Sequence, residues 1–139
     1  MADEAVAALV VRFYGQLWNR WDDPAVEHTL AEDFTFRGSL GNQTTGREGW
    51  RTYRDLTRRY APDFHNDIVS LVTDNNRAAA RLTYTGTHLG PVLGFPPTGR
   101  RFSYSGAAFF TATDGLLSDA WVLGDLDTLR SFLAGDVPD

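Results

Sequence analysis

Apolar positions at the start of the chain recur at helical spacing. Side chains three and four residues apart predict an amphipathic helix over residues 4–20, and Tyr14 and Trp18 widen its apolar face. Asp23-Pro24 predicts a second, short helix, because Asp is a favourable N-cap and Pro suits the first helical position. Residues 34–36 then predict a short strand.

A third helix is predicted to run from Thr45 to about Tyr60. Residues 45–48 fit the capping-box pattern at its start, and Pro62 follows its end. Its expected buried face comprises Trp50, Tyr53 and Leu56. Its arginines admit two interpretations, an anion-binding face or a solvated face paired locally with Glu48 and Asp55. These arginines are Arg47, Arg51, Arg54 and Arg58.

From residue 64 onward the hydrophobic period changes to two, which is typical of strands. Turn residues at 74–76 and at Asp114-Gly115 predict two tight hairpins. Residues 90–99, rich in Gly and Pro, form a longer connection. The predicted strands span 64–73, 77–88, 100–111 and 116–124, and a last helix spans 126–134.

This order of elements predicts an α+β fold in a single domain over residues 1–139. Helices come first and an antiparallel meander follows, so the helices are segregated from the sheet. We expect a cone-shaped α+β barrel in which a curved antiparallel sheet wraps around the N-terminal helices and leaves a ligand pocket between the layers. The aromatic share of 13% suits such a pocket.

Composition narrows the function classes. The net charge of -5 argues against nucleic-acid binding. There is no Cys, which excludes disulfides and thiolate chemistry. All 13 basic residues are Arg, a bias typical of GC-rich actinobacterial genomes. The acidic N-terminus does not resemble a signal peptide, and no apolar run is long enough to span a membrane, so we expect a cytoplasmic protein.

Common catalytic and metal-binding motifs are missing from the sequence. His28, His65 and His88 have no metal-ligand spacing, so we expect no metal site. The chain contains no phosphate-binding loop, no G-x-G-x-x-G and no G-x-S-x-G nucleophile elbow.

Several local motifs resemble those of SnoaL-like polyketide cyclases, also called ester cyclases, of the nuclear transport factor 2-like superfamily. Residues 86–90 (GTHLG) and 94–101 (GFPPTGRR) resemble the family's G-T-H-x-G…G-x-P-P-T-G-R-R stretch. Residues 114–125 are similar to its D-G-x-I…W…D ending. Phe13-Tyr14 with Trp18-Asn19, and residues 62–64, also fit, so the resemblance covers nearly the whole chain.

The resemblance implies a small-molecule enzyme of secondary metabolism that needs no metal or cofactor. Family members close polyketide rings by intramolecular aldol condensation, and an Asp near the end of the last long strand acts as general acid/base. By the motif that residue is Asp125. The expected substrate is a hydrophobic, aromatic or polyketide-derived carbonyl compound, and an isomerase is a related option.

Strand alternation places Trp121, Leu123 and Asp125 on one face, which we expect to be the inner one. Desolvation there would raise the pKa of Asp125 and make it a better base. The alternative is that Asp125 only caps the last helix.

Two further residues are candidates for the catalytic site. His88 shares a face with Tyr84 and is either a proton partner or a structural residue bonded to the 90–99 loop. Arg37 stands where many relatives have His, and is either an oxyanion stabiliser or part of a surface or interface salt bridge. The rings expected to bind substrate are Tyr14, Trp18, Trp50, Tyr53, Phe64, Tyr84, Tyr104 and Trp121.

The same residues leave two alternatives to a cyclase open, and they also predict an oligomeric state. An epoxide hydrolase would need Asp67 and an Arg such as Arg37 or Arg81 in the cavity with Asp125, and a non-catalytic binding protein would need no base. His65 and Asp67 share a strand face and form either a cavity pair or part of a dimer surface. The Thr- and Arg-rich outward face of residues 77–87 suits a polar contact, so we expect a homodimer.

Overall fold

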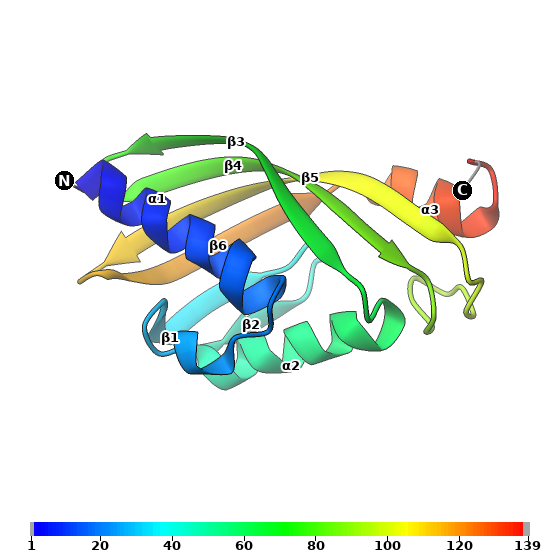
Figure 1. The fold of residues 1–139 in the computed structure, drawn as a ribbon, viewed down its shortest axis with the longest axis horizontal. Coiled ribbons are helices and arrows are strands. Elements are labelled where there is room, and N and C mark those ends of the chain that lie inside the picture. Colours follow the sequence, from blue (N-terminus) through cyan, green and yellow to red (C-terminus); the bar gives the residue numbers. More distant parts are fainter. Residues whose placement is uncertain (1, 138–139) are drawn as a thin grey trace.

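In the computed structural model, which describes residues 2–137, a long curved sheet covers one side of the N-terminal helix and α2 (Figure 1). The predicted fold class is confirmed, and the boundaries of the long strands and of the last helix agree within two residues. In chain order the elements are α1 (Ala2–Arg12), the π-helix η1 (Phe13–Trp18), the 3₁₀ helix η2 (Asp23–Ala25), β1 (Leu30–Arg37), β2 (Gln43–Thr45), α2 (Gly46–Tyr60), β3 (His65–Asp74), β4 (Arg77–Thr87), β5 (Arg101–Thr113), β6 (Leu116–Gly124) and α3 (Leu126–Ala134).

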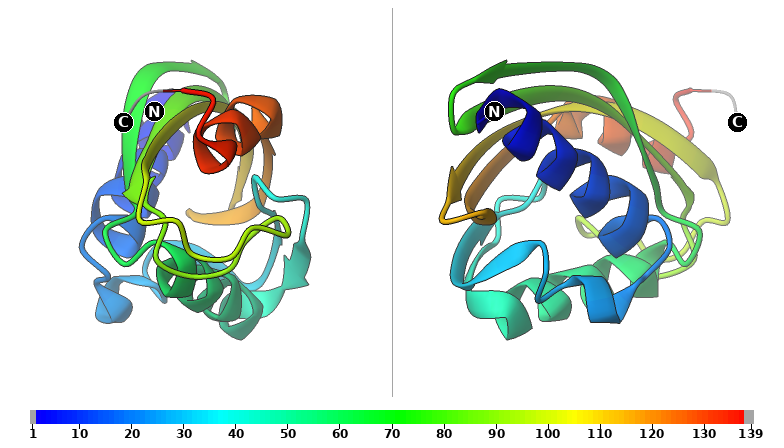
Figure 2. Two further views of the ribbon diagram at one scale, coloured as in Figure 1. Left: turned by 90° about the vertical axis from the view of Figure 1, so that its right-hand side faces the viewer. Right: turned by 60° about the vertical axis from the view of Figure 1, so that its left-hand side comes forward.

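The six strands form one sheet in the order β2-β1-β6-β5-β4-β3. The sheet is mixed rather than antiparallel throughout, because β1 pairs with β6 in parallel. Within the described chain β2 and β3 are its two edges, so the barrel does not close. Seen from its end, the sheet bends around the interior, with α2 on the opposite side (Figure 2). β2 escaped prediction because it is three residues long and polar.

Both predicted hairpin turns are present. Asn75 has φ 62°, and Asp114 and Gly115 have φ 52° and 82°. Consecutive residues with positive φ match the right-handed twist of the flanking strands, and Asp-Gly adopts that conformation at low cost.

Helix α2 begins where the sequence predicts, but the capping box does not form. The Thr45 side chain makes no cap hydrogen bond, and Glu48 pairs instead with Arg51. Leu56, expected to be buried, is 44% exposed. Trp50 and Tyr53 are buried as predicted, and the helix also buries Arg54, Thr57 and Tyr60.

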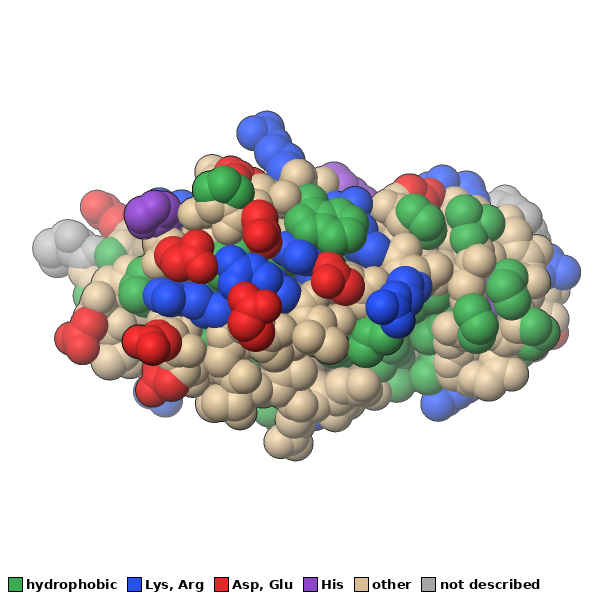
Figure 3. Space-filling model, turned by 90° about the horizontal axis from the view of Figure 1, so that it is seen from below, with side chains coloured by type: hydrophobic (Ala, Val, Ile, Leu, Met, Phe, Trp, Pro, Cys, Tyr) green, Lys and Arg blue, Asp and Glu red, His purple; other side chains and the backbone are tan. Residues whose placement is uncertain are grey.

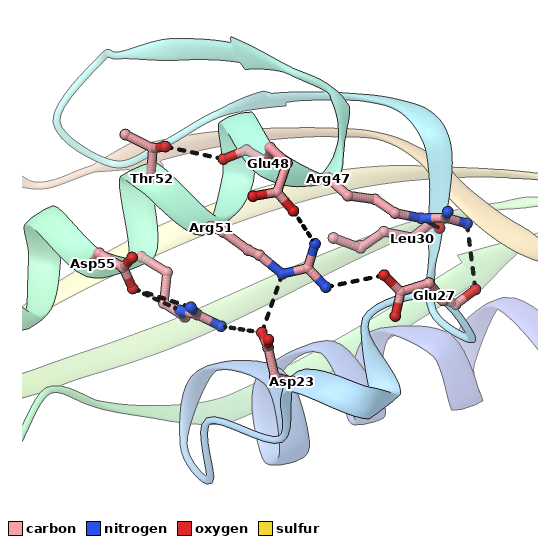
Figure 4. A network of polar contacts seen from close by, with 9 residues as sticks. Asp23, Glu27, Leu30, Arg47, Glu48, Arg51, Thr52 and Asp55 are labelled. Carbon is pink, nitrogen blue, oxygen red and sulfur yellow. Dashed lines mark hydrogen bonds and ion pairs between the residues drawn. The ribbon is translucent and has the colours of Figure 1, made fainter.

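Two arginines of the α2 stripe form the local pairs that the second interpretation proposed, Arg51 with Glu48 and Arg54 with Asp55, and both also bond acidic residues that precede the helix. Arg51 bonds Asp23 at 3.1 Å and Glu27 at 3.0 Å (Figure 4). Arg54, which is buried, bonds the same Asp23 at 2.9 Å. Seen from the α2 side, arginine and acidic side chains gather together on this face of the molecule (Figure 3). The network ties η2 and the segment after it onto α2.

The convex face of the sheet carries a row of outward side chains. The residues predicted to face outward on β4 do so. Ala79 lies opposite Val72 on one side and Phe109 on the other, and Phe109 lies opposite Trp121. Phe109 and Trp121 are 51% and 42% exposed, with ring centroids 6.0 Å apart.

No helix among residues 2–137 is both long enough and apolar enough to cross a membrane.

Candidate functional site

The concave face of the sheet and the helices enclose a cavity of about 20 Å³, which is room for about one water molecule. The predicted pocket is therefore present between the layers, but it is far smaller than the few hundred Å³ of a typical small-molecule site, because aromatic side chains fill most of the space. The cavity is lined by Tyr14, Trp18, Phe36, Ser39, Tyr53, Thr57, Tyr60, Phe64, Asn66, Tyr84 and Val122.

Three local structures aim these side chains inward. The π-helical turn is closed by the bond from Asn19 N–H to Tyr14 O at 2.9 Å, and Tyr14 and Trp18, four residues apart on it, are both buried in the interior. Spacing along α2 directs Tyr53 and Tyr60 to the same space. Alternation along the strands turns the remaining lining residues of the sheet toward the cavity.

Glycines on the sheet make room for two of the rings. The ring of Tyr84 lies over Gly106, where an added Cβ would stand 2.7 Å from the Tyr84 hydroxyl oxygen. The ring of Tyr53 covers Gly38 in the same way, and a Cβ there would overlap it. These two positions cannot take a larger side chain unless a cavity ring moves.

All five tyrosines of the chain are buried, four in the cavity wall and Tyr104 beside it. Burial raises the pKa of every one of these phenols above the ordinary value of 10.0. They therefore stay protonated at neutral pH. The cavity is lined with neutral O–H groups.

Several of these polar groups have protein partners. Ser39 Oγ and the Tyr104 hydroxyl are 3.0 Å apart, and Leu40 N–H donates to the Tyr53 hydroxyl at 3.3 Å. Asn66 is held by Asn19, whose side-chain oxygen accepts from both the backbone and the amide of Asn66. The Tyr14 hydroxyl is different, because it is buried and has no hydrogen-bond partner among the described residues. An unmet buried hydroxyl costs about 1–3 kcal/mol.

Asp125 does not lie in this cavity. It is exposed at the start of α3 and accepts hydrogen bonds from the backbone N–H of Thr128 at 3.2 Å and its hydroxyl at 2.7 Å. These bonds lower its pKa, the opposite of the shift we expected. Asp125 therefore caps α3, as the alternative interpretation proposed.

The error came from the choice of strand face. Both faces of β6 are apolar, so alternation alone could not say which is inner. The inner face carries the smaller Ala120 and Val122, which leave room for the cavity rings. Trp121 and Leu123 project from the convex face.

Arg37 also lies outside the cavity, on the same convex side. Its guanidinium sits 4.8 Å from the centre of the Trp121 ring and donates to the carbonyl oxygen of Val122. The expectation of an inward oxyanion stabiliser is therefore wrong. Arg37 lies on the outer side as the alternative proposed, but its partners are a backbone carbonyl and the Trp121 ring rather than a carboxylate.

His88 shares the buried face of Tyr84, as predicted, but its ring is not part of the cavity wall. Its Nδ1 accepts from the backbone N–H of Thr98 at 3.2 Å and lies 2.9 Å from the Thr98 hydroxyl oxygen. This is the bond to the 90–99 loop that the structural alternative described. Burial lowers the pKa of His88, which favours the neutral ring.

The groups that an epoxide hydrolase would need are not assembled. Asp67 is exposed on the outer face of β3, paired with His65 at 3.2 Å, and Arg81 is exposed as well. Within residues 2–137 no three His, Cys, Asp or Glu side chains are grouped to hold a metal ion.

Five of the eight rings expected to bind substrate line the cavity: Tyr14, Trp18, Tyr53, Phe64 and Tyr84. Trp50 lies behind Trp18, with ring centroids 5.5 Å apart, Tyr104 lies beside the cavity, and Trp121 faces outward. Our prediction missed Phe36, Ser39, Thr57, Tyr60, Asn66 and Val122. The helical spacing from Tyr53 through Thr57 to Tyr60 was a usable signal for two of these.

Comparison with known proteins gives one family. The model of the family described as SnoaL-like polyketide cyclase matches residues 8–137. A search of curated proteins gave no match.

Solved structures agree in fold. The chain is 28% identical to TsrD from Streptomyces laurentii, with a TM-score of 0.82 over 96% of this chain and 97% of that one. It is 26% identical to AclR, a proposed hydroxylase from Streptomyces galilaeus, with a TM-score of 0.79 over 99% and 85%. A proposed SnoaL-like polyketide cyclase from Jannaschia, 17% identical, has the same fold, with a TM-score of 0.86 over 99% and 96%.

Proposed function

Because the chain belongs to the SnoaL-like polyketide cyclase family, we propose that its tyrosine-lined cavity binds a polyketide-derived carbonyl compound and promotes ring closure or isomerisation without a cofactor. The family and its structural neighbours support a cyclase-type role in secondary metabolism. The observation that carries the proposal is the enclosed wall of aromatic rings and neutral hydroxyl donors.

Such a wall suits enolate chemistry. When a C–H bond next to a carbonyl ionises, negative charge develops on the carbonyl oxygen, and fixed O–H donors in a dry site stabilise it. Tyrosines that stay protonated are suited to this task. In an aldol closure the enolate carbon then attacks a second carbonyl, and the alkoxide formed there takes up a proton.

The cavity wall supplies no strong base, since its described residues include no carboxylate and no imidazole. The proposal therefore favours substrates with acidic C–H groups, such as methylenes between two carbonyls. These ionise readily once one carbonyl oxygen is hydrogen-bonded, and a single water molecule bound with the substrate takes the proton and returns it to the alkoxide.

Binding has to widen the cavity, because its present volume admits about one water molecule. The Ser39–Leu40 turn and the Tyr53 ring that it bonds are the proposed place of opening. One hydrogen bond of 3.3 Å, from Leu40 to Tyr53, joins them.

A non-catalytic binding protein is the second candidate. The position of Asp125 favours it, because this carboxylate is exposed and bonded to Thr128 rather than aimed at the cavity. Both candidates share the same cavity and differ only in whether a bound compound is turned over.

We also propose that the chain forms a homodimer through the convex face of the sheet. The row of Val72, Phe109 and Trp121, with the neighbouring Leu123, forms an exposed apolar patch between the Thr- and Arg-rich positions of β4. A second copy that covered this patch would remove its side chains from water.

Two measurements test the function. 2-Acetonaphthone, an aromatic ketone, should quench the fluorescence of Trp18 and Trp50, and a linear β-polyketone should cyclise faster with the protein than without it. Val122→Phe fills the cavity and should abolish both effects, while Val11→Phe, at an exposed site on α1, should change neither. Binding without acceleration would favour the binding protein, and absence of binding would overturn both candidates.

A further inference from the structure

One hydroxyl in the cavity lacks the partner that buried polar groups normally have. Tyr14 is almost fully buried, and within the described part of the chain its hydroxyl makes no hydrogen bond. Its neighbour in the wall, Tyr84, is also a protonated phenol. Even if these two hydroxyls shared one hydrogen bond, one O–H would remain without an acceptor. At least one O–H donor of this pair therefore has no acceptor among the described residues.

The backbone around Tyr14 is unusual as well. Tyr14 is the second residue of the π-helix, a rare conformation that occurs preferentially at functional sites. Tyr14 and Trp18, four residues apart on this turn, both line the cavity, so a flat ligand that packs on the Trp18 ring would share the cavity with the Tyr14 hydroxyl.

The cavity wall carries no formal charge. Its described residues are aromatic, aliphatic, hydroxyl or amide side chains. An ionised ligand would lose its hydration there without meeting an opposite charge, which is strongly unfavourable. An uncharged ligand with an acceptor oxygen would satisfy the spare donor without bringing a charge into the cavity.

From these observations we propose that Tyr14 donates a hydrogen bond to the carbonyl oxygen of an uncharged aryl ketone or quinone, and that this bond makes the site select ketones over carboxylates. The inference rests on the proposed function, since it assumes that the cavity is the ligand site. It assigns to Tyr14 a binding and specificity role that the sequence pattern did not distinguish from that of the other rings.

The test uses three naphthalene probes of similar size: 2-acetonaphthone, 2-isopropylnaphthalene and 2-naphthoate. Wild type should bind the ketone about tenfold more tightly than the hydrocarbon, and should bind the carboxylate most weakly at neutral pH. Tyr14→Phe should remove the preference for the ketone and leave the affinity for the hydrocarbon unchanged. Tyr104→Phe should keep the preference, because Tyr104 lies beside the cavity and its hydroxyl is already paired with Ser39.

Stability gives an independent readout. Because the Tyr14 hydroxyl has no partner, Tyr14→Phe should unfold at the same urea concentration as wild type or a higher one. Marked destabilisation, a ketone preference that survives in Tyr14→Phe, or naphthoate binding equal to that of the ketone would each overturn the inference alone. If no probe binds wild type, the proposed function fails too.

Discussion

Asp125 accepts two hydrogen bonds from Thr128, one from its backbone N–H and one from its hydroxyl, and so closes the first turn of α3. Asn is as good an N-cap as Asp, whereas Ala cannot accept a hydrogen bond. We expect Asp125→Asn to melt close to wild type and Asp125→Ala to melt roughly 2–6 °C lower, as followed by circular dichroism. Both variants should bind 2-acetonaphthone normally.

Asp127→Asn is the matched control, because Asp127 lies in the same turn but is not the capping residue. It should resemble wild type in melting and binding. If Asp125→Asn folded and bound normally but lost turnover, the acid/base role that the family resemblance implies would be restored and the capping account would be incomplete.

Much of this fold could be predicted from the sequence, because several independent sequence features mark each long strand and helix. The strand 116–124 and the helix 126–134 match the structure in their bounds, since turn residues, period and length all agree there. The parallel pairing of β1 with β6 has no local signal, because it joins residues more than 80 positions apart. The general location of the pocket followed from the order of the elements.

The details of the site depended on which face of β6 turns inward. Trp121 and Leu123 look more core-like than Ala120 and Val122, but the concave face is already crowded with rings from other elements. The interior therefore takes the smaller residues. That packing constraint can be seen only once all the layers are placed, and it moved Asp125 out of the predicted site.

Gly106 is predicted to be intolerant of even a methyl group. An added Cβ would stand within 3 Å of the Tyr84 ring and hydroxyl, which form the cavity wall. Gly106→Ala should therefore cost about 1–3 kcal/mol in urea unfolding and weaken probe binding. Gly15→Ala is the control, since its Cβ meets nothing within 4 Å and Ala favours a helix.

A second substitution checks the mechanism of that loss. If the clash with the Tyr84 ring is the cause, Tyr84→Ala should cost less stability in the Gly106→Ala background than in wild type. Equal costs in the two backgrounds would mean that the glycine is needed for another reason.

The convex face gives a prediction about assembly. Trp121 is exposed and packs against Phe109 and the Arg37 guanidinium. We expect wild type to have the mass of a dimer in light scattering at micromolar concentration, and Trp121→Glu to be a monomer, because a carboxylate in an apolar interface would be desolvated. Leu56→Glu, an equally exposed site on α2, should leave the dimer intact. A monomeric wild type would refute the interface.

His88 couples the stability of the fold to pH through the 90–99 loop. Its Nδ1 can accept the Thr98 N–H only while the ring is neutral, and a proton on that nitrogen breaks the bond. The neighbouring backbone holds the loop ends together, since His88 N–H donates to Arg100 O and Gly99 N–H to His88 O, both at 2.8 Å. Protonation would therefore disturb a segment that is tied to β4 and β5.

The sign of the effect follows from the direction of the shift. Burial puts the folded pKa of His88 below the ordinary value of 6.5, so as pH falls through 6.5 the unfolded chain takes up a proton that the folded chain refuses. The contribution of His88 to the free energy of unfolding is complete above pH 6.5. As the pH falls below this value the contribution decreases, with the slope that uptake of at most one proton on unfolding gives, and it levels off below the folded pKa.

Urea unfolding at pH 7.5, 6.5 and 5.5 should show this decline in wild type and in His28→Asn, whose imidazole is exposed. His88→Asn keeps an acceptor oxygen that does not titrate, and should show a smaller decline. The same pH dependence in all three proteins would exclude His88 as its source.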